Sequence, residues 1–236
     1  MNNLPFYISL VFVLTTFASI YIFYKAAHRK KQVLYILFSW LIIQSAIALT
    51  GFYTETTTIP PRFILLIGPP LLFIVILFIN SRGRSMIDSL DKSMLTLLHV
   101  VRIPVEVVLL WLSIHKTIPE IMTFEGRNLD ILSGISALVI YFLMFSLKKY
   151  NRTVLLIWNF ICLGLLINIV VIAILSAPFV FQRMAFDQPN VALMYFPFIW
   201  LPAIVVPLVL LAHLSSIRQL LLERKLRASS FELRVQ

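Results

Sequence analysis

Seven long apolar segments constrain this chain of 236 residues more than any other feature of its sequence. A helix needs ~20 mostly apolar residues to cross a lipid bilayer. The segments that approach this length run from about Leu4–Tyr24, Val33–Phe52, Phe63–Asn80, Met94–His115, Ile131–Leu147, Val154–Ser176 and Leu193–Ser215. Because the connections are short, consecutive helices should be antiparallel neighbours. The sequence predicts an all-α polytopic integral membrane protein, with a seven-helix transmembrane domain at 1–217 and a basic amphipathic cytoplasmic tail at 218–236.

The composition excludes an ordinary soluble domain. Only 13% of the residues are charged and 60% are hydrophobic, whereas a soluble domain carries roughly a quarter charged residues. Long unbroken apolar runs also argue against a transmembrane β-barrel, whose segments alternate in hydropathy. The single cysteine, Cys162, lies inside an apolar run and is expected to be a core residue.

The basic residues predict the orientation of the bundle. Cytoplasmic loops carry an excess of Lys and Arg. The first, third and fifth connections and the tail hold 15 of the 20 basic residues, namely Lys25, Arg29, Lys30, Lys31, Arg82, Arg84, Lys92, Lys148, Lys149, Arg152, Arg218, Arg224, Lys225, Arg227 and Arg234. This split predicts an outside N-terminus and a cytoplasmic C-terminus in the inner membrane. The net charge of +10 then faces anionic lipid headgroups, so we expect no nucleic-acid partner.

Prolines are expected to distort three of the segments. Proline removes one helical hydrogen bond and frees the carbonyl four residues earlier. Gly68-Pro69-Pro70 should kink or break the third segment, and Pro104 should disturb the fourth. The seventh contains Pro197, Pro202 and Pro207. Freed carbonyls inside a membrane must be buried in protein or line a wet cavity.

The fourth segment contains three ionisable residues on one helical stripe. At ~100° per residue, His99, Arg102 and Glu106 fall on the same side. Each charged group in a bilayer costs at least ~2.5–3.5 kcal/mol on insertion scales, so such groups usually have a partner or a function. Arg102 and Glu106 are four residues apart and can pair on their own helix.

Depth along the helices suggests which polar residues meet these three. With a rise of ~1.5 Å per residue, His99 lies ~8 Å, Arg102 ~12 Å and Glu106 ~18 Å inside the cytoplasmic end. Other helices place polar residues at similar depths. The candidate ligand-binding residues are therefore His99, Arg102, Asn159 and His213 in a cytoplasmic layer, and Glu106, Gln44 and Asn168 in a central layer.

The leading functional hypothesis is a non-enzymatic binding protein of transporter or sensor type. A guanidinium recognises carboxylate or phosphate in a bidentate manner, so Arg102 with His99 suits an anionic small molecule or a lipid headgroup. Proton coupling through Glu106 and His99 is a further option, because buried carboxylates and histidines titrate when their partners change. Membrane lipids are expected partners, and a homo-oligomer is possible.

Two alternatives stay open. The first is a metal-dependent or haem-containing membrane enzyme, with His99, His213 and Glu106 as candidate zinc ligands or His99 and His213 as axial ligands of a b-type haem. The second is purely structural, with the polar residues holding helices together. The sequence contains neither an HExxH zinc motif nor the Gly-x-Ser-x-Gly motif of serine nucleophiles, and we expect no cofactor.

Two further segments have a plain and a functional interpretation. Asn128 could cap the fifth helix, with Asp130 near its positive N-terminal end, or this connection could form an outer lid or a ligand-contacting turn. The basic helix after Ser215 could lie on the inner membrane surface, or it could project and pair with a partner.

Overall fold

The computed structural model describes residues 4–235, with side chains up to Arg224, and shows only helices and loops within that range. The helices are α1 Phe6–Ala26, α2 Lys31–Leu49, α3 Ile64–Ile79, α4 Ser81–Asp88, α5 Lys92–Leu98, α6 Arg102–Ile114, α7 Ile131–Tyr141, α8 Arg152–Leu175 and α9 Val206–Val235. The all-α prediction is confirmed for these residues.

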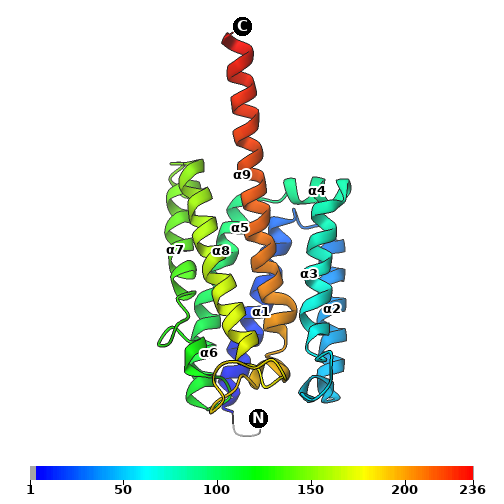
Figure 1. The fold of residues 1–236 in the computed structure, drawn as a ribbon. Coiled ribbons are helices and arrows are strands. Elements are labelled where there is room, and N and C mark those ends of the chain that lie inside the picture. The colour runs from blue at the N-terminus through cyan, green and yellow to red at the C-terminus, as the bar shows by residue number, and fades with distance from the viewer. Residues whose placement is uncertain (1–3, 236) are drawn as a thin grey trace.

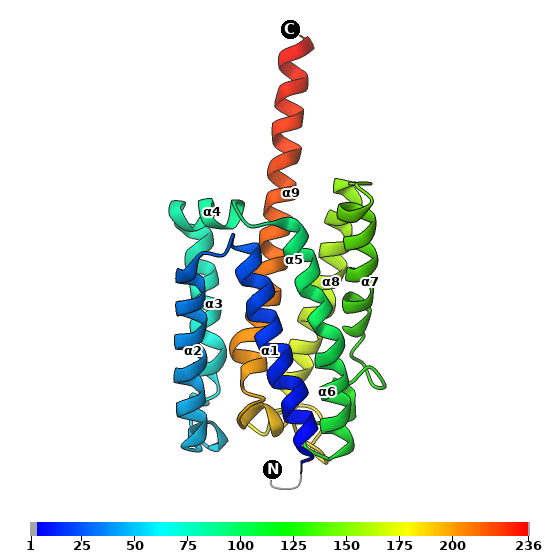
Figure 2. The ribbon, with the colours of Figure 1, turned by 180° about the vertical axis from the view of Figure 1, so that it is seen from behind.

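The helices form one upright bundle. Both ribbon views place α2, α3 and α4 on one side, α7 and α8 on the other, and α1, α5 and α9 between them (Figures 1 and 2). We call the end where α1 begins the N-terminal end, and the opposite end, from which α9 projects, the C-terminal end. Because α9 continues unbroken to Val235, the helix shows no boundary at the predicted start of the tail.

Five helices within residues 4–235 are long and apolar enough to cross a membrane: Phe6–Ala26, Lys31–Leu49, Lys92–Ile114, Arg152–Leu175 and Leu201–Arg224. The third predicted segment forms α3, which is followed by α4 at an angle of 94°. If α3 and α4 are counted together as one bent span, the number of candidate spans rises to six. The fifth predicted segment, Ile131–Leu147, forms the apolar helix Ile131–Ser146, which is shorter than a full span. The apolar helices indicate a membrane protein, with five rather than seven of the predicted segments qualifying by length and composition.

The prolines act differently in the three helices that contain them. Pro69 and Pro70 lie in the second turn of α3, which runs unbroken to Ile79, so the predicted break does not occur there. The chain bends instead between α3 and α4, where an added Cβ at Gly83 would lie 2.4 Å from the carbonyl oxygen of Leu77. Only glycine permits this close approach of two backbones.

The other two proline-containing helices change their winding. A 3₁₀ turn, His99–Val101, joins α5 to α6 just before Pro104. A π-helical turn, Leu201–Val205, precedes α9 and contains Pro202. Both distortions accommodate the missing proline N–H, and both are the kind of irregularity often found at functional sites.

Segments from distant parts of the sequence meet at the C-terminal end. The Asp91 N–H donates to the carbonyl of Ala26 at 2.9 Å. Arg218 of α9 pairs with both carboxylate oxygens of Asp88, at 2.8 and 2.9 Å. The basic first and third connections and the start of the tail therefore share one end of the bundle.

Candidate functional site

The short helix α7 begins in the interior of the bundle. Asp130, directly before α7, lies beside Arg102, the first residue of α6. From there α6 continues for 12 residues to Ile114, which is ~18 Å along a helix axis. Figure 1 shows the chain leaving α6 at the N-terminal end and returning before α7 starts. The connection between α6 and α7 therefore carries polar residues deep into the protein.

Arg102 and Asp130 form a buried ion pair. Arg102 Nε lies 3.0 Å from Asp130 Oδ2, and the two residues are 2% and 4% exposed. Arg102 Nη2 also donates to the carbonyl oxygen of Cys162 on α8, at 3.2 Å. Arg102 thus pairs across helices with Asp130, and the expected pairing with Glu106 on the same helix is not formed.

A glycine on α7 permits this pairing. A Cβ built on Gly134 would lie 2.8 Å from Ile103 Cγ1 and 3.0 Å from the Ile103 backbone nitrogen. Such contacts are closer than real Cβ atoms make. The missing side chain lets α7 pack directly on the first turn of α6, which holds Asp130 against Arg102.

Asn128 links Glu106 to the α6–α7 connection. Its Nδ2 donates to Glu106 Oε1 at 2.6 Å and to the carbonyl of Met122 at 3.0 Å. Its Oδ1 accepts a hydrogen bond from the Asp130 N–H at 3.0 Å, a local turn typical of asparagine. Asn128 is fully buried. It both stabilises the turn before α7 and contacts the Glu106 carboxylate.

Two histidines stack beside the ion pair. The rings of His99 and His213 are 3.8 Å apart at their centroids and 20° from parallel. His213 Nδ1 lies 2.9 Å from Asn159 Oδ1, and the Asn159 amide donates to the carbonyl of Leu155. The Asn159 amide nitrogen therefore faces Leu155 and its oxygen faces His213. Because an amide oxygen can only accept, His213 Nδ1–H is the donor in this hydrogen bond. Trp158 packs edge-on against His99 at 5.4 Å.

These residues together form what we call the interior polar cluster. Its members are all 4% exposed or less: His99, Arg102, Glu106, Asn128, Asp130, Asn159 and His213. Several of their buried atoms have no hydrogen-bond partner among the described residues, namely His99 Nδ1 and Nε2, Arg102 Nη1, Glu106 Oε2, Asp130 Oδ1 and His213 Nε2. Buried polar atoms are normally paired, so each of these atoms carries a desolvation cost that no contact with the described residues offsets.

The charges of the cluster do not balance. It contains two carboxyl groups, Glu106 and Asp130, and one guanidinium, Arg102. Asp130 is matched by Arg102, whereas Glu106 receives only the neutral amide of Asn128. With both histidines neutral, ionisation of both carboxyls would leave one buried negative charge uncompensated.

The structure separates the seven predicted ligand-binding residues into two groups. It brings together His99, Arg102, Glu106, Asn159 and His213. Gln44, on α2, is buried and accepts a hydrogen bond from Tyr53, on the far side of α1 and α9 from α7 and α8 (Figures 1 and 2). Asn168 is exposed on α8 and donates to the carbonyl of Arg127. Neither of these two belongs to the cluster.

The residues present do not fit the metal or haem alternatives. Within residues 4–235, no three His, Cys, Asp or Glu side chains lie close enough to hold one ion. Axial ligation of a haem would place iron and the porphyrin plane between His99 and His213. Rings stacked at 3.8 Å leave no space for that plane.

Asn128 and Asp130 were not among the predicted site residues. From the sequence they were interpreted as a helix cap, or as part of an outer lid or a ligand-contacting turn. One signal was available: Arg127-Asn128-Leu129-Asp130 immediately precedes an apolar segment too short to span a bilayer. A short apolar helix with polar residues at its start is consistent with a start inside the membrane.

Comparison with known proteins identifies a family without an assigned activity. Residues 59–221 match the family described as a domain of unknown function, DUF8737. This match covers more than half of the chain, so the chain belongs to that family. The matched range includes every member of the interior polar cluster. No curated protein and no solved structure matches the chain significantly.

Proposed function

We propose that this DUF8737 protein is a membrane-embedded binding protein of transporter or sensor type, and that its interior polar cluster takes up and releases one proton. The observation that supports this is the unmatched Glu106 carboxyl in a cluster closed to solvent. An uncompensated charge buried in a membrane protein is costly. A proton on Glu106 removes that cost without any further ligand.

The groups around Glu106 offer routes for proton movement. Arg102 and Asp130 lie beside it from α6 and from the residue before α7. His99 of the 3₁₀ turn, His213 of α9 and Cys162 of α8 interact with Arg102 in turn. The histidine ring nitrogens without partners can accept or pass on a proton. Arg102 is occupied by Asp130, so an anionic ligand would have to displace that carboxylate.

The cluster contacts elements that can change shape. His99 lies in the 3₁₀ turn between α5 and α6, and His213 lies on α9, which extends beyond the bundle (Figure 1). A positive charge shared by stacked histidines would weaken their contact through repulsion. Movement of α9 relative to α5 and α6 would then serve either as a transport step or as a signal to the cytoplasm.

The proposed topology has the C-terminal end of the bundle in the cytoplasm. The basic connections meet at that end, as the positive-inside rule requires. All seven apolar segments would lie in the membrane, with α3–α4 as one bent span and α7 as a helix that starts at depth. Such interrupted helices near the bilayer midplane occur at the binding sites of transporters.

The test records intrinsic tryptophan fluorescence, to which Trp158 contributes beside His99, with pH as the only variable. The purified full chain is measured between about pH 6 and 10 for the wild type, Glu106→Gln and the exposed-site control Glu125→Gln. We expect a pH-dependent change in the wild type and the control, and none in Glu106→Gln. Identical responses of all three proteins would refute the proposal.

A second measurement separates transport from sensing. The same proteins are reconstituted in vesicles with an internal pH-sensitive dye, and a potassium diffusion potential is imposed. A transporter acidifies or alkalinises the vesicle interior in a Glu106-dependent manner. A sensor gives the fluorescence response without any flux.

A further inference from the structure

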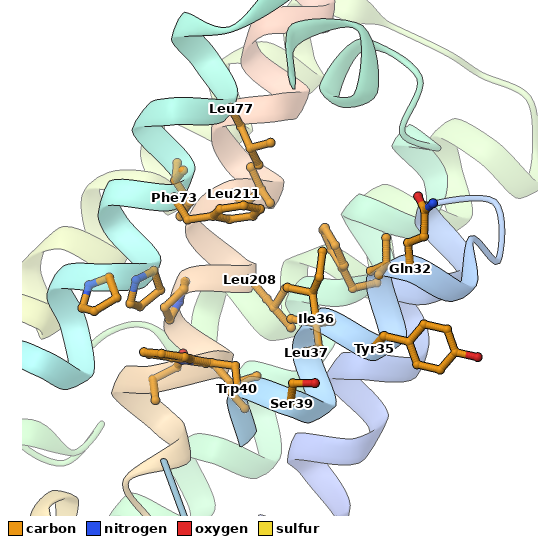
Figure 3. A pocket seen from close by; sticks show the side chains of 18 of the residues that line it. Gln32, Tyr35, Ile36, Leu37, Ser39, Trp40, Phe73, Leu77, Leu208 and Leu211 are labelled. Atoms are coloured by element: carbon orange, nitrogen blue, oxygen red, sulfur yellow. The ribbon is translucent and has the colours of Figure 1, made fainter. Parts of the chain in front are cut away.

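A wide groove separates α2 from α3 on the side of the bundle away from the interior polar cluster. It has a volume of about 770 Å³, within the range of sites that hold a small organic ligand. Residues of α2 and α3 form its walls, and α9 with the preceding π-helical turn forms its floor. Figure 3 shows Phe73 and Leu77 from α3 and Leu208 and Leu211 from α9 around this space.

The groove is apolar along most of its length and opens sideways. Wall residues such as Ile36 and Phe73 are 53% and 45% exposed, so the groove is open to the surroundings of the bundle. In a membrane those surroundings are acyl chains. An apolar channel of this kind offers a lipid tail more contact than a smooth helical surface does.

Trp40 lines the inner part of the groove. Trp40 Nε1 donates to the carbonyl of Ala203 at 3.0 Å, which ties α2 to the π-helical turn. Ten residues separate Trp40 from Lys30, the residue that precedes α2, which is ~15 Å along the helix. The groove is therefore a slot that runs from the C-terminal end of the bundle toward its middle.

The end of the slot at Lys30 is positively charged. Among the residues that the structure describes, Lys30 is the one charged residue that lines the groove, and Gln32, two positions further along the chain, also lines it. The first turn of α2 has no acidic residue and no side-chain cap, so its N–H groups add partial positive charge. Lys25 and Arg29 lie shortly before the same helix. An apolar slot with a basic mouth at the headgroup level matches a molecule with an apolar tail and an anionic head.

We propose that the α2–α3–α9 groove binds one anionic phospholipid, with an acyl chain in the slot and the phosphate at Lys30. This site is separate from the interior polar cluster, and the inference does not depend on the proposed proton binding.

The test uses the full chain in vesicles that contain a trace of a phospholipid with a photoactivatable diazirine at the end of one acyl chain. The probe lipid is either phosphatidylglycerol or phosphatidylcholine. After illumination, mass spectrometry locates the labels. The phosphatidylglycerol probe should label the peptides that contain Trp40, Phe73 and Leu208 about tenfold more than the phosphatidylcholine probe does.

Three variants make the test specific. Lys30→Glu should lower labelling by the phosphatidylglycerol probe about tenfold, since it reverses a charge at the mouth. Lys31→Glu, with the same charge change at an exposed neighbour outside the groove, should stay close to the wild type. Ser39→Trp should fill the slot and lower labelling by both probes, with thermal unfolding used to confirm that this variant is folded.

Three outcomes would overturn the inference. Equal labelling by the two probe lipids would identify the groove as an ordinary lipid-facing surface. An equal loss in Lys30→Glu and Lys31→Glu would assign the effect to general surface charge. Cross-linking of two chains through the groove, with no lipid label, would identify it as a protein interface.

Discussion

Asp130 Oδ2 lies 3.0 Å from Arg102 Nε, although 28 positions separate the two residues and the intervening chain travels to the N-terminal end and back. Both side chains are buried. This pair fixes the depth at which α7 starts, and it leaves Glu106 as the carboxyl without a charged partner.

Breaking the pair on one side should be strongly destabilising. Asp130→Asn removes the ion-pair partner of the buried Arg102 guanidinium, at a cost of about 3–5 kcal/mol. The double variant Arg102→Met, Asp130→Leu should recover most of this loss, because both charges leave together. Thermal unfolding of the purified proteins measures both effects. A double variant as unstable as the single one would show that the pair does more than satisfy its own charges.

A methyl group at Gly134 should push α7 away from α6. Gly134→Ala places a Cβ 2.8 Å from Ile103 Cγ1, and overpacking of this kind costs about 1–3 kcal/mol. Gly164→Ala on α8 is the matched control, since its Cβ would have no neighbour within 4 Å. The control should be neutral or slightly stabilising, because alanine favours helix. Equal unfolding temperatures for both variants would contradict the close approach of α7 and α6.

The hydrogen bond of His213 to Asn159 should stabilise the cluster. His213→Phe keeps an aromatic ring beside His99 but removes the donor to Asn159 Oδ1, which then stays buried without its partner. The expected loss is about 1–3 kcal/mol in the free energy of unfolding. Adding Asn159→Leu should restore part of it, since the orphaned amide is removed. If the second substitution destabilises the protein further, the bond is not the source of the loss.

Asp91 should make stability depend on pH in the acidic range. Burial alone raises the pKa of Asp91, but hydrogen bonds from the Ser93 hydroxyl and from the Met94 and Ser93 N–H groups outweigh it and lower that pKa. A lowered pKa stabilises the folded state above the unfolded-state value, and this contribution is lost as pH falls through the folded-state value. Asp91→Asn keeps the cap and should flatten the dependence of the unfolding temperature between about pH 5 and 3. An unchanged slope would contradict this assignment.

The sequence predicted the long helices well because hydropathy is a local property. Runs such as Phe6–Ala26 and Arg152–Leu175 follow directly from their apolar residues. Kinks and changes of helix type were harder to predict, because a helix can accommodate a proline in several ways. Pro69 and Pro70 are tolerated within α3, while Pro104 follows a 3₁₀ turn.

The candidate site was predicted in part, since depth along a helix says nothing about which helices are neighbours. His99, Arg102, Asn159 and His213 share a depth and also meet. Gln44 was placed with Glu106 on depth alone, yet α2 lies elsewhere in the bundle. The Arg102–Asp130 pair depends on a connection that returns into the interior, which no local pattern specifies.

The proton on Glu106 can be observed directly by infrared spectroscopy of the purified full chain. A protonated carboxyl has a carbonyl absorption that a carboxylate lacks. We predict that the wild-type protein at neutral pH shows this band from a buried carboxylic acid, and that Glu106→Gln loses it while Glu125→Gln retains it. A spectrum of the wild type that matches that of Glu106→Gln in this region would contradict the proposal.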